Sequence, residues 1–129
     1  MTVRVVRLGT PRQPDEGLRL GTVRRPPRGV PKGKLADWYD VWLPQLAPSA
    51  PLVKAALAAG TQREWDAFVR KYRAEMARPD NARLIALLAA LSHRTDFAVG
   101  CYCEDESRCH RSVLRQLLTD AGARLTFAG

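Results

Sequence analysis

The chain has 129 residues, of which 46% are hydrophobic and 26% are charged, values close to those of soluble globular proteins, so we expect a folded domain and exclude a disordered chain. The formal net charge of +8 is concentrated in residues 1–34, which hold nine Lys or Arg and two acidic residues, and this favours anionic partners. Three cysteines within nine residues do not form the disulfide framework of a small secreted protein, and no apolar run is long enough for a membrane span, so we expect a cytoplasmic protein with no membrane partner.

The first part of the chain combines one strand with a long basic loop. Thr2–Leu8 is rich in β-branched side chains and ends before Gly9, which predicts a strand. Residues 9–34, called the basic loop below, are rich in Pro, Gly and Arg, and we expect only a short strand within them, at Leu18–Val23. Two interpretations of this loop stay open, namely an anion-binding surface and a solvated surface arm.

The middle of the chain is predicted to be helical. The expected helices cover Leu35–Leu46, Leu52–Ala59, Thr61 to about Met76, and Ala82–Leu91. The first of them would present an aromatic face and break at Pro44. Thr61 followed three residues later by Glu64 is the pattern of a capping box, and Asp80 or Asn81 is expected to cap the last helix.

The last part of the chain alternates strand and helix. Phe97–Cys103 is short and apolar, as expected for a parallel strand that is covered on both faces. Arg108–Ala121 carries apolar side chains at helical spacing and is followed by Gly122, which suits a helix end, and Leu125–Phe127 is expected to form a final strand. The alternation predicts an α/β protein with a mostly parallel sheet flanked by helices.

The residues that suit chemistry lie where the strand Phe97–Cys103 ends and the next helix begins. Ligands of parallel sheets bind beyond the carboxyl ends of the strands, and the first turn of a helix offers N–H groups and a positive dipole end to an anion. Thiols in such surroundings tend toward thiolate, so Cys103 and Cys109 are the candidate catalytic thiols. His110 titrates near neutral pH in its unperturbed form and is the candidate acid or base.

Three further side chains are expected to bind the ligand. Arg111 offers a planar fork that matches phosphate or carboxylate, and Arg28 of the basic loop is expected to close over the same anion. Glu104 is expected to orient Arg111 or His110. Basic side chains in the first turn oppose the helix dipole, which indicates that they face a negative charge.

Zinc is the main rival interpretation of the cysteines, because Cys101-x-Cys103 and the pair Cys109-His110 supply four potential ligands. In a strand, however, residues two apart are separated by about 6.6 Å, which is too far for two sulfurs around one zinc ion. We therefore expect no metal and no cofactor. Cys101 is interpreted as a small buried core residue without a chemical role.

Several segments of the chain together match a known pattern. They are Pro27–Val30, Trp42-Leu43, Leu46–Ser49, Trp65, Phe68, Tyr72 and Glu75 in the body, and Cys103, Glu104, Cys109, His110 and Arg111 in the turn. In this combination the chain resembles the family known as domain of unknown function 488, in particular its YeaO-like branch. The resemblance implies a single three-layer, Rossmann-like α/β domain over residues 1–129, and it implies no particular reaction.

Three functions stay open at this point. The first is an anion-binding site, catalytic or binding only, for a small phosphate-bearing molecule or nucleotide at the turn from Cys103 to Arg111. The second is a nucleic-acid-binding module that uses the basic first quarter, although residues 1–34 lack the aromatic side chains on which single-stranded bases stack. The third is a protein that senses redox state or metal through its thiols.

Overall fold

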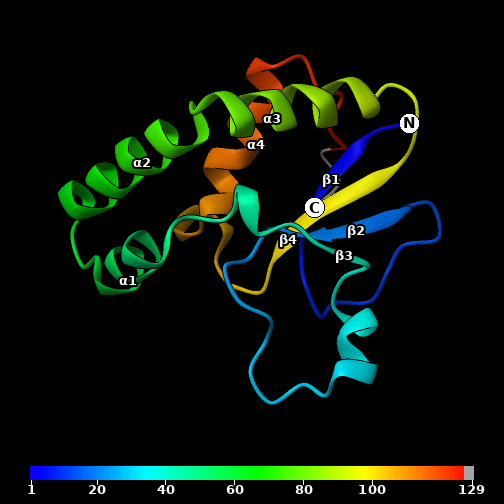
Figure 1. Ribbon diagram of the computed structural model, residues 1–129, viewed down its shortest axis with the longest axis horizontal. Coiled ribbons are helices and arrows are strands. Elements are labelled where there is room, and N and C mark those ends of the chain that lie inside the picture. The colour runs from blue at the N-terminus through cyan, green and yellow to red at the C-terminus, as the bar shows by residue number, and fades with distance from the viewer. Residues whose placement is uncertain (127–129) are drawn as a thin grey trace.

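Four short strands form one parallel sheet in the computed structural model, which describes residues 1–126 (Figure 1). The strands are β1 (Val3–Arg7), β2 (Leu18–Gly21), β3 (Val41–Trp42) and β4 (Phe97–Cys101). Their order across the sheet is β1-β4-β2-β3, and every ladder is parallel. The carboxyl ends of all strands therefore lie along the same edge, where ligands of such sheets bind.

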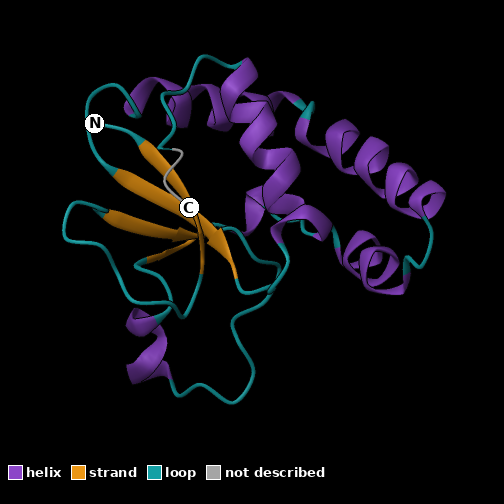
Figure 2. Ribbon diagram, turned by 180° about the vertical axis from the view of Figure 1, so that it is seen from behind, coloured by secondary structure: helices purple, strands orange, loops and turns teal. Residues whose placement is uncertain are grey.

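The four α-helices gather on one side of this sheet (Figure 2). The α-helices are α1 (Ala50–Ala58), α2 (Gln62–Met76), α3 (Pro79–Leu91) and α4 (His110–Asp120). Three short 3-10 helices complete the structure, namely η1 (Lys32–Asp37), η2 (Pro44–Leu46) and η3 (Glu106–Arg108). The described residues thus form the α/β, Rossmann-like fold with a parallel sheet that the sequence predicts.

The main core lies between the sheet and helices α2, α3 and α4. Val3, Phe97 and Val99 are buried in it because alternate strand residues point to the same face. They meet a helical side whose buried side chains include Tyr72 and Leu114. Truncating any one of these fully buried apolar side chains to Ala would cost about 2–5 kcal/mol of stability.

The opposite face of the sheet carries a buried ion pair instead of a helix. Arg19 of β2 donates to both carboxylate oxygens of Glu16, at 2.7 and 3.0 Å, and to the carbonyl of Thr10 at 2.9 Å. Both side chains of the pair are 1% exposed. Residues on either side of β2, among them Thr10 and Tyr39, cover this face, and Gly21 leaves room for the ring of Tyr39, which a Cβ at that position would approach within 2.5 Å.

Local signals predict several elements correctly. β1, β2 and β4 form where the apolar segments predict strands, and α2 begins with the expected capping box, because Thr61 Oγ1 accepts a hydrogen bond from the Glu64 amide at 3.1 Å. α4 ends at Asp120, and Gly122 follows with a φ of 92°, which suits glycine. The helix predicted over residues 82–91 begins earlier, at Pro79, so Arg78 takes the N-cap position and the predicted cap at Asp80 or Asn81 is wrong.

The helix predicted over residues 35–46 is wrong. This segment instead holds the end of η1, strand β3 and η2. The cause is tertiary: the Asp40 amide donates to the Arg19 carbonyl at 2.7 Å, while the Asp40 carboxylate accepts from the Arg19 amide at 2.8 Å and from Arg12 at 2.6 Å. These bonds draw the chain alongside β2. Of the predicted final strand, Leu125 makes a parallel bridge to Val3, and Phe127 lies outside the described residues.

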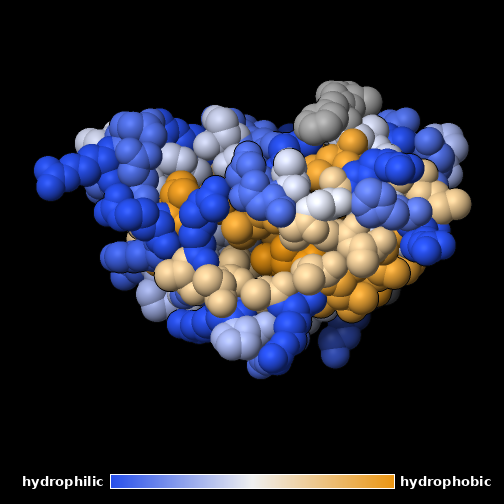
Figure 3. Space-filling model, turned by 90° about the horizontal axis from the view of Figure 1, so that it is seen from above, coloured by the Kyte–Doolittle hydropathy of each residue, from blue (hydrophilic) through white to orange (hydrophobic). Residues whose placement is uncertain are grey.

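The surface on the helical side contains an apolar area inside a hydrophilic rim (Figure 3). Large exposed apolar side chains of the helices are Leu57, Leu87 and Leu91. Among residues 1–126, no helix combines the length and the apolar character that crossing a membrane requires.

Candidate functional site

Three thiols converge where β4 ends and α4 begins. Their sulfur atoms all lie within 4.8 Å of one another, and the sulfurs of Cys101 and Cys103 are 3.6 Å apart. Cys101 and Cys109 are buried, whereas Cys103 is half-buried, and all three are unpaired. We call these three residues the thiol cluster; its position at the carboxyl edge of the sheet agrees with the site predicted from the sequence.

The extended strand geometry on which the sequence argument against zinc depends is not found in the structure. β4 ends at Cys101, so Cys103 lies just beyond the strand, in the turn, and not within the strand as predicted. The chain bends at this point, and the separation of 3.6 Å between the two sulfurs replaces the expected spacing of about 6.6 Å. Cys101 is also a member of the cluster and not merely a core residue.

Local bonds shape the turn that carries Cys109 to the start of α4. Asp105 accepts a hydrogen bond from the Ser107 amide at 3.0 Å, which starts η3. Glu106 and Arg115 of α4 form a two-pronged ion pair, with both N–O distances at 2.9 Å. Cys109 then takes the N-cap position of α4 in extended backbone geometry. The acidic residues of this turn therefore fold it and tie it to the helix.

His110 lies in the first turn of α4, as predicted, and links Cys109 to Thr22, the residue that follows β2. Its Nδ1 is 3.7 Å from the Cys109 sulfur, and its Nε2 is 2.6 Å from the carbonyl oxygen of Thr22. A carbonyl oxygen can only accept, so Nε2 carries a proton and donates it. The ring is thus oriented with Nδ1 facing the thiol, where it can accept or return a proton.

Negative charge in the thiol cluster is concentrated on Cys109. Hydrogen bonds from Cys101 and then Cys103, followed by His110, lower the pKa of Cys109 despite its burial. The pKa of Cys101 is raised, first by its hydrogen bond to Cys103. The hydrogen bond from Cys101 acts to lower the pKa of Cys103, but its bond to Cys109 and its burial leave that pKa raised. The first proton therefore leaves the cluster easily, and the others leave with difficulty.

Arg111 is a buried cation beside the thiols. Its side chain donates to the Cys103 carbonyl at 2.6 Å, the residue is 3% exposed, and its Nε has no hydrogen-bond partner. Within residues 1–126, no carboxylate lies within ion-pair distance of its guanidinium group. Its charge instead acts on Cys103, whose pKa it lowers as a smaller contribution.

Glu104 does not orient Arg111 or His110 as the sequence predicts. Its carboxylate is exposed and lies 3.7 Å from Arg7, the last residue of the neighbouring strand β1. The predicted partner of Arg111 is replaced by the backbone of Cys103, because the turn places Glu104 on the outside.

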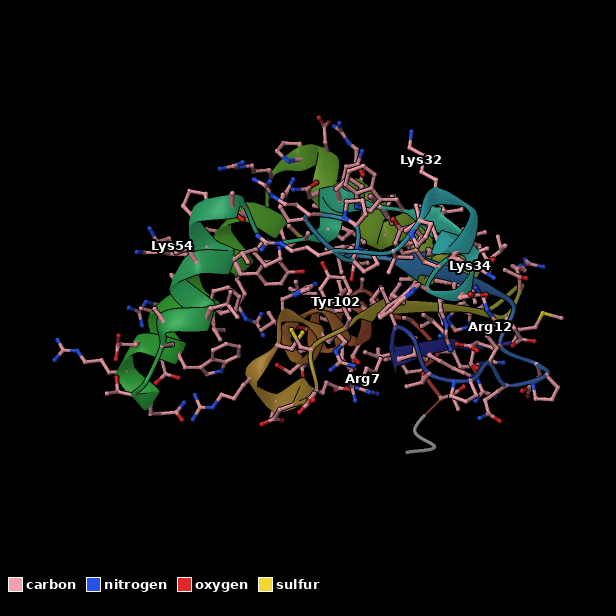
Figure 4. The ribbon with its side chains drawn as sticks, turned by 90° about the horizontal axis from the view of Figure 1, so that it is seen from below. Arg7, Arg12, Lys32, Lys34, Lys54 and Tyr102 are labelled. Atoms are coloured by element: carbon pink, nitrogen blue, oxygen red, sulfur yellow. The ribbon has the colours of Figure 1, made fainter. Side chains whose placement is uncertain are left out.

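Arg28 lines a pocket of about 580 Å³, to which Tyr102, the residue between Cys101 and Cys103, also contributes. Arg7, Trp38 and Tyr102 line the same pocket, whereas Arg111 and the three cysteines are not among its lining residues. Figure 4 shows Tyr102 and Arg7 close together in the view from below. Sequence reasoning missed Trp38 and Tyr102 as site residues, although the position of Tyr102 between two motif cysteines is a usable signal.

The turn can therefore hold a thiolate, move a proton at His110 Nδ1, and supply three sulfur ligands to a thiophilic metal ion. In comparisons with known proteins, the family model described as the Active DUF488-N3 subclade matches residues 3–122. No curated protein and no solved structure matches the chain.

Proposed function

The chain belongs to the DUF488 family, and from this premise we propose that its thiol cluster, with His110 and Arg111, is a catalytic site for a small anionic molecule. The description of the matching subclade as active is in keeping with a catalytic role. We also propose a cytoplasmic location, because a reducing compartment keeps unpaired thiols such as these three reduced.

One observation carries this proposal, namely that a buried arginine faces thiols and not a carboxylate. A buried cation without a counter-charge costs several kcal/mol, so Arg111 needs a negative partner in its surroundings. The charge of Arg111 also acts weakly on the exposed carboxylate of Asp105, but the thiol cluster is the buried group beside Arg111 that can supply a negative charge, by losing one proton. Arg111 thus stabilises the ionised cluster.

Cys109, Cys103 and His110 have different roles in the proposed nucleophilic site. Cys109 holds the negative charge, supported by the N-terminus of α4 and by thiol donors. Cys103 is the half-buried member and is the first thiol that an entering molecule meets. Proton exchange between the two sulfurs allows either of them to attack, and His110 Nδ1 takes up or returns the proton.

An anionic substrate is favoured by the charge around the site. The chain carries a net charge of +8, and the helix N-terminus and Arg111 add positive potential at the thiols. Such a potential attracts a negatively charged molecule and also stabilises the thiolate that would attack it.

Alkylation by a matched pair of reagents tests the proposal. Iodoacetate and iodoacetamide deliver similar groups, but only iodoacetate is an anion. We expect Cys103 or Cys109 to react below pH 7, and the ratio of the iodoacetate rate to the iodoacetamide rate to exceed that of a free cysteine by about tenfold, or about 1.4 kcal/mol. Peptide mass spectrometry identifies the alkylated sulfur.

The control for this experiment is a second arginine in the same turn. Arg111→Gln should remove the preference for iodoacetate and shift the reaction to higher pH. Arg108→Gln, which changes an exposed arginine that contacts Gln62, should leave both unchanged. Ordinary thiol reactivity in the unaltered protein, or an equal effect of the two substitutions, would contradict the proposal.

A thiophilic metal ion is the second candidate, because the sulfur positions favour it. Sulfurs about 2.3 Å from a tetrahedral zinc ion are about 3.8 Å apart, close to the 3.6 Å between Cys101 and Cys103. Three thiolates and a divalent ion carry one net negative charge, which Arg111 would balance. Such an ion would act as a Lewis acid at its fourth coordination position.

Cobalt(II) titration separates the two candidates. Metal binding predicts sulfur-to-cobalt charge-transfer bands at one ion per chain, loss of these bands in Cys109→Ser, and protection of the thiols from iodoacetamide until a chelator is added. Absence of the bands in the unaltered, reduced protein would exclude the metal candidate and leave the nucleophile.

A further inference from the structure

The pocket that contains Arg28 lies at the point where the chain connections diverge. Its lining includes Arg7, which ends β1, Thr10 in the loop after β1, and Tyr102, which follows β4. β1 and β4 are neighbours, yet the chain leaves β1 toward the η1 side of the sheet and leaves β4 toward α4 on the other side (Figure 1). In parallel sheets such a divergence opens a crevice, and this crevice is the usual ligand site. We call it the switch-point pocket.

Two cationic side chains border the switch-point pocket. Arg28 is exposed, and within the described residues no carboxylate lies within ion-pair distance of it. Arg7 is 47% exposed and has only a long contact of 3.7 Å with the exposed Glu104. Both guanidinium groups are therefore free to bind a phosphate, whose geometry suits their paired N–H donors.

Two aromatic rings form the apolar side of the same pocket. Trp38 and Tyr102 meet edge to face, with ring centroids 6.1 Å apart and an angle of 86°. The Tyr102 hydroxyl donates to the Arg25 carbonyl at 2.7 Å, which holds the segment carrying Arg28 against the end of β4. Gly9, with φ of 89°, lets the Trp38 ring lie close, since a Cβ there would be 2.9 Å from it. The rings are thus held in place, and a flat ligand can stack on them.

We propose that the switch-point pocket binds a nucleoside monophosphate, with its phosphate between Arg7 and Arg28 and its base against Trp38 or Tyr102. The combination of paired cations and fixed rings selects a ligand that has both a flat ring and an anionic group. The volume of about 580 Å³ lies within the range of small-molecule sites. This inference rests on the proposed function for the idea that the thiol cluster acts on an anionic molecule, and it names the class of that molecule.

Tyr102 connects the pocket to the thiol cluster. It lies between Cys101 and Cys103 in the chain, with its ring in the pocket and its two neighbours in the cluster. A nucleotide stacked on this ring would therefore lie beside the half-buried thiol of Cys103. Binding itself requires only the pocket and does not need a thiolate.

Calorimetric titration of the full chain with AMP, GMP, CMP and UMP tests the inference, with adenosine and inorganic phosphate as half-ligands. We expect at least one nucleotide to bind with millimolar affinity or better, and at least about tenfold more tightly than either half-ligand. Arg28→Gln should weaken that nucleotide by about fivefold to tenfold and leave the nucleoside unchanged. Arg25→Gln alters the neighbouring exposed arginine, which does not line the pocket, and should leave both unchanged.

A variant of Trp38 tests whether the aromatic rings bind the base. Trp38→Leu should weaken nucleotide and nucleoside by similar factors, and circular dichroism checks that it is folded. The inference is overturned if no nucleotide binds to the unaltered protein, if inorganic phosphate binds as tightly as the nucleotides, or if Arg25→Gln has the effect expected of Arg28→Gln.

Cys109→Ser keeps this inference separate from the proposed function. The variant should bind the nucleotide with unchanged affinity, because the pocket does not use the sulfur, and a loss of affinity there would contradict a pocket that binds independently. Nucleotide binding together with ordinary thiol reactivity would refute the proposed function and leave the inference intact. Reactive thiols without nucleotide binding would refute the inference and leave the proposed function intact.

Discussion

Replacing His110 by Phe should raise the pKa at which the thiol cluster first ionises. The substitution preserves a ring beside Tyr72, whose centroid lies 5.6 Å from that of His110, but removes both ring nitrogens. A proton at Nδ1 attracts a thiolate 3.7 Å away by at most about 4.5 kcal/mol when the effective dielectric constant is about 20. This upper limit corresponds to about 3 pKa units.

The observed rise should be smaller than this limit, about 1–3 pKa units, because hydrogen bonds from Cys101 and Cys103 contribute more than His110 to the lowered pKa of Cys109. The Thr22 carbonyl also loses its donor, so the free energy of unfolding should fall by about 1–3 kcal/mol.

The assay follows the ultraviolet absorbance of the thiolate against pH, with mass spectrometry of alkylated peptides to identify the sulfur. His93→Phe is the matched control, because that histidine is exposed and its ring bonds to the carbonyl of Gly122, away from the thiol cluster. An unchanged titration in His110→Phe, or equal shifts in the two variants, would refute the assignment of Nδ1 as the partner of Cys109.

Charge burial, backbone geometry and thiol ionisation set three further expectations. Glu16→Gln leaves buried Arg19 without its carboxylate and should lower the free energy of unfolding by about 3–5 kcal/mol. Asp15→Asn changes an exposed carboxylate paired with Arg4 and should lower it by less than about 1 kcal/mol. Urea unfolding measures both, and equal losses would contradict the burial of the Glu16–Arg19 pair. Gly17→Ala would place a Cβ 1.9 Å from the backbone oxygen of Asp96, whereas Gly122→Ala has open space at a similarly positive φ. Gly17→Ala should therefore destabilise the protein by about 1–3 kcal/mol more than Gly122→Ala. Indistinguishable melting temperatures of the two variants would show that the clash is absent. With one thiol pKa lowered and two raised, the free energy of unfolding should rise with pH up to the ordinary thiol pKa of about 8.5 and then fall by up to about 2.7 kcal/mol per pH unit. Replacing the whole thiol cluster by Ser should remove the rise and reduce the fall, leaving near pH ~10 the fall that comes from buried Tyr72, whose pKa is also raised; denaturant unfolding between about pH 6 and 10 measures both slopes.

The signs of these slopes follow from the protons bound in each state. Below the ordinary thiol pKa, the unfolded chain keeps all three protons while the folded cluster has lost one, so raising the pH favours the folded state. Above it, the unfolded chain loses all three protons while the folded cluster retains two, so raising the pH favours unfolding.

Local rules alone determined much of the fold. The capping box at Thr61, the apolar run at the start of β4 and the glycine that ends α4 are all confirmed, because each depends on residues within a turn or a strand of one another. The same closeness in sequence let the motif between Cys103 and Arg111 indicate a strand-to-helix turn with thiols, imidazole and guanidinium together.

Contacts between distant segments decided the rest. Nothing near Asp40 in the chain reveals that Arg19 will pair with it and turn a predicted helix into a strand. The carbonyl of Thr22 that orients His110 comes from 88 residues away. The contact of Trp38 with Tyr102 likewise depends on how the basic loop crosses the edge of the sheet.

The partners of Glu104 and Arg111 separate most clearly what the sequence determines from what the tertiary structure decides. The sequence by itself determined that thiols, a histidine and an arginine share one turn at the carboxyl edge of a sheet. Only the tertiary structure decided that Glu104 faces Arg7, that Arg111 is buried against the Cys103 carbonyl, and that the three sulfurs converge. The physical reason is that helix and strand formation depends on near neighbours in the chain, whereas burial and electrostatic pairing depend on which loops the packed core brings together.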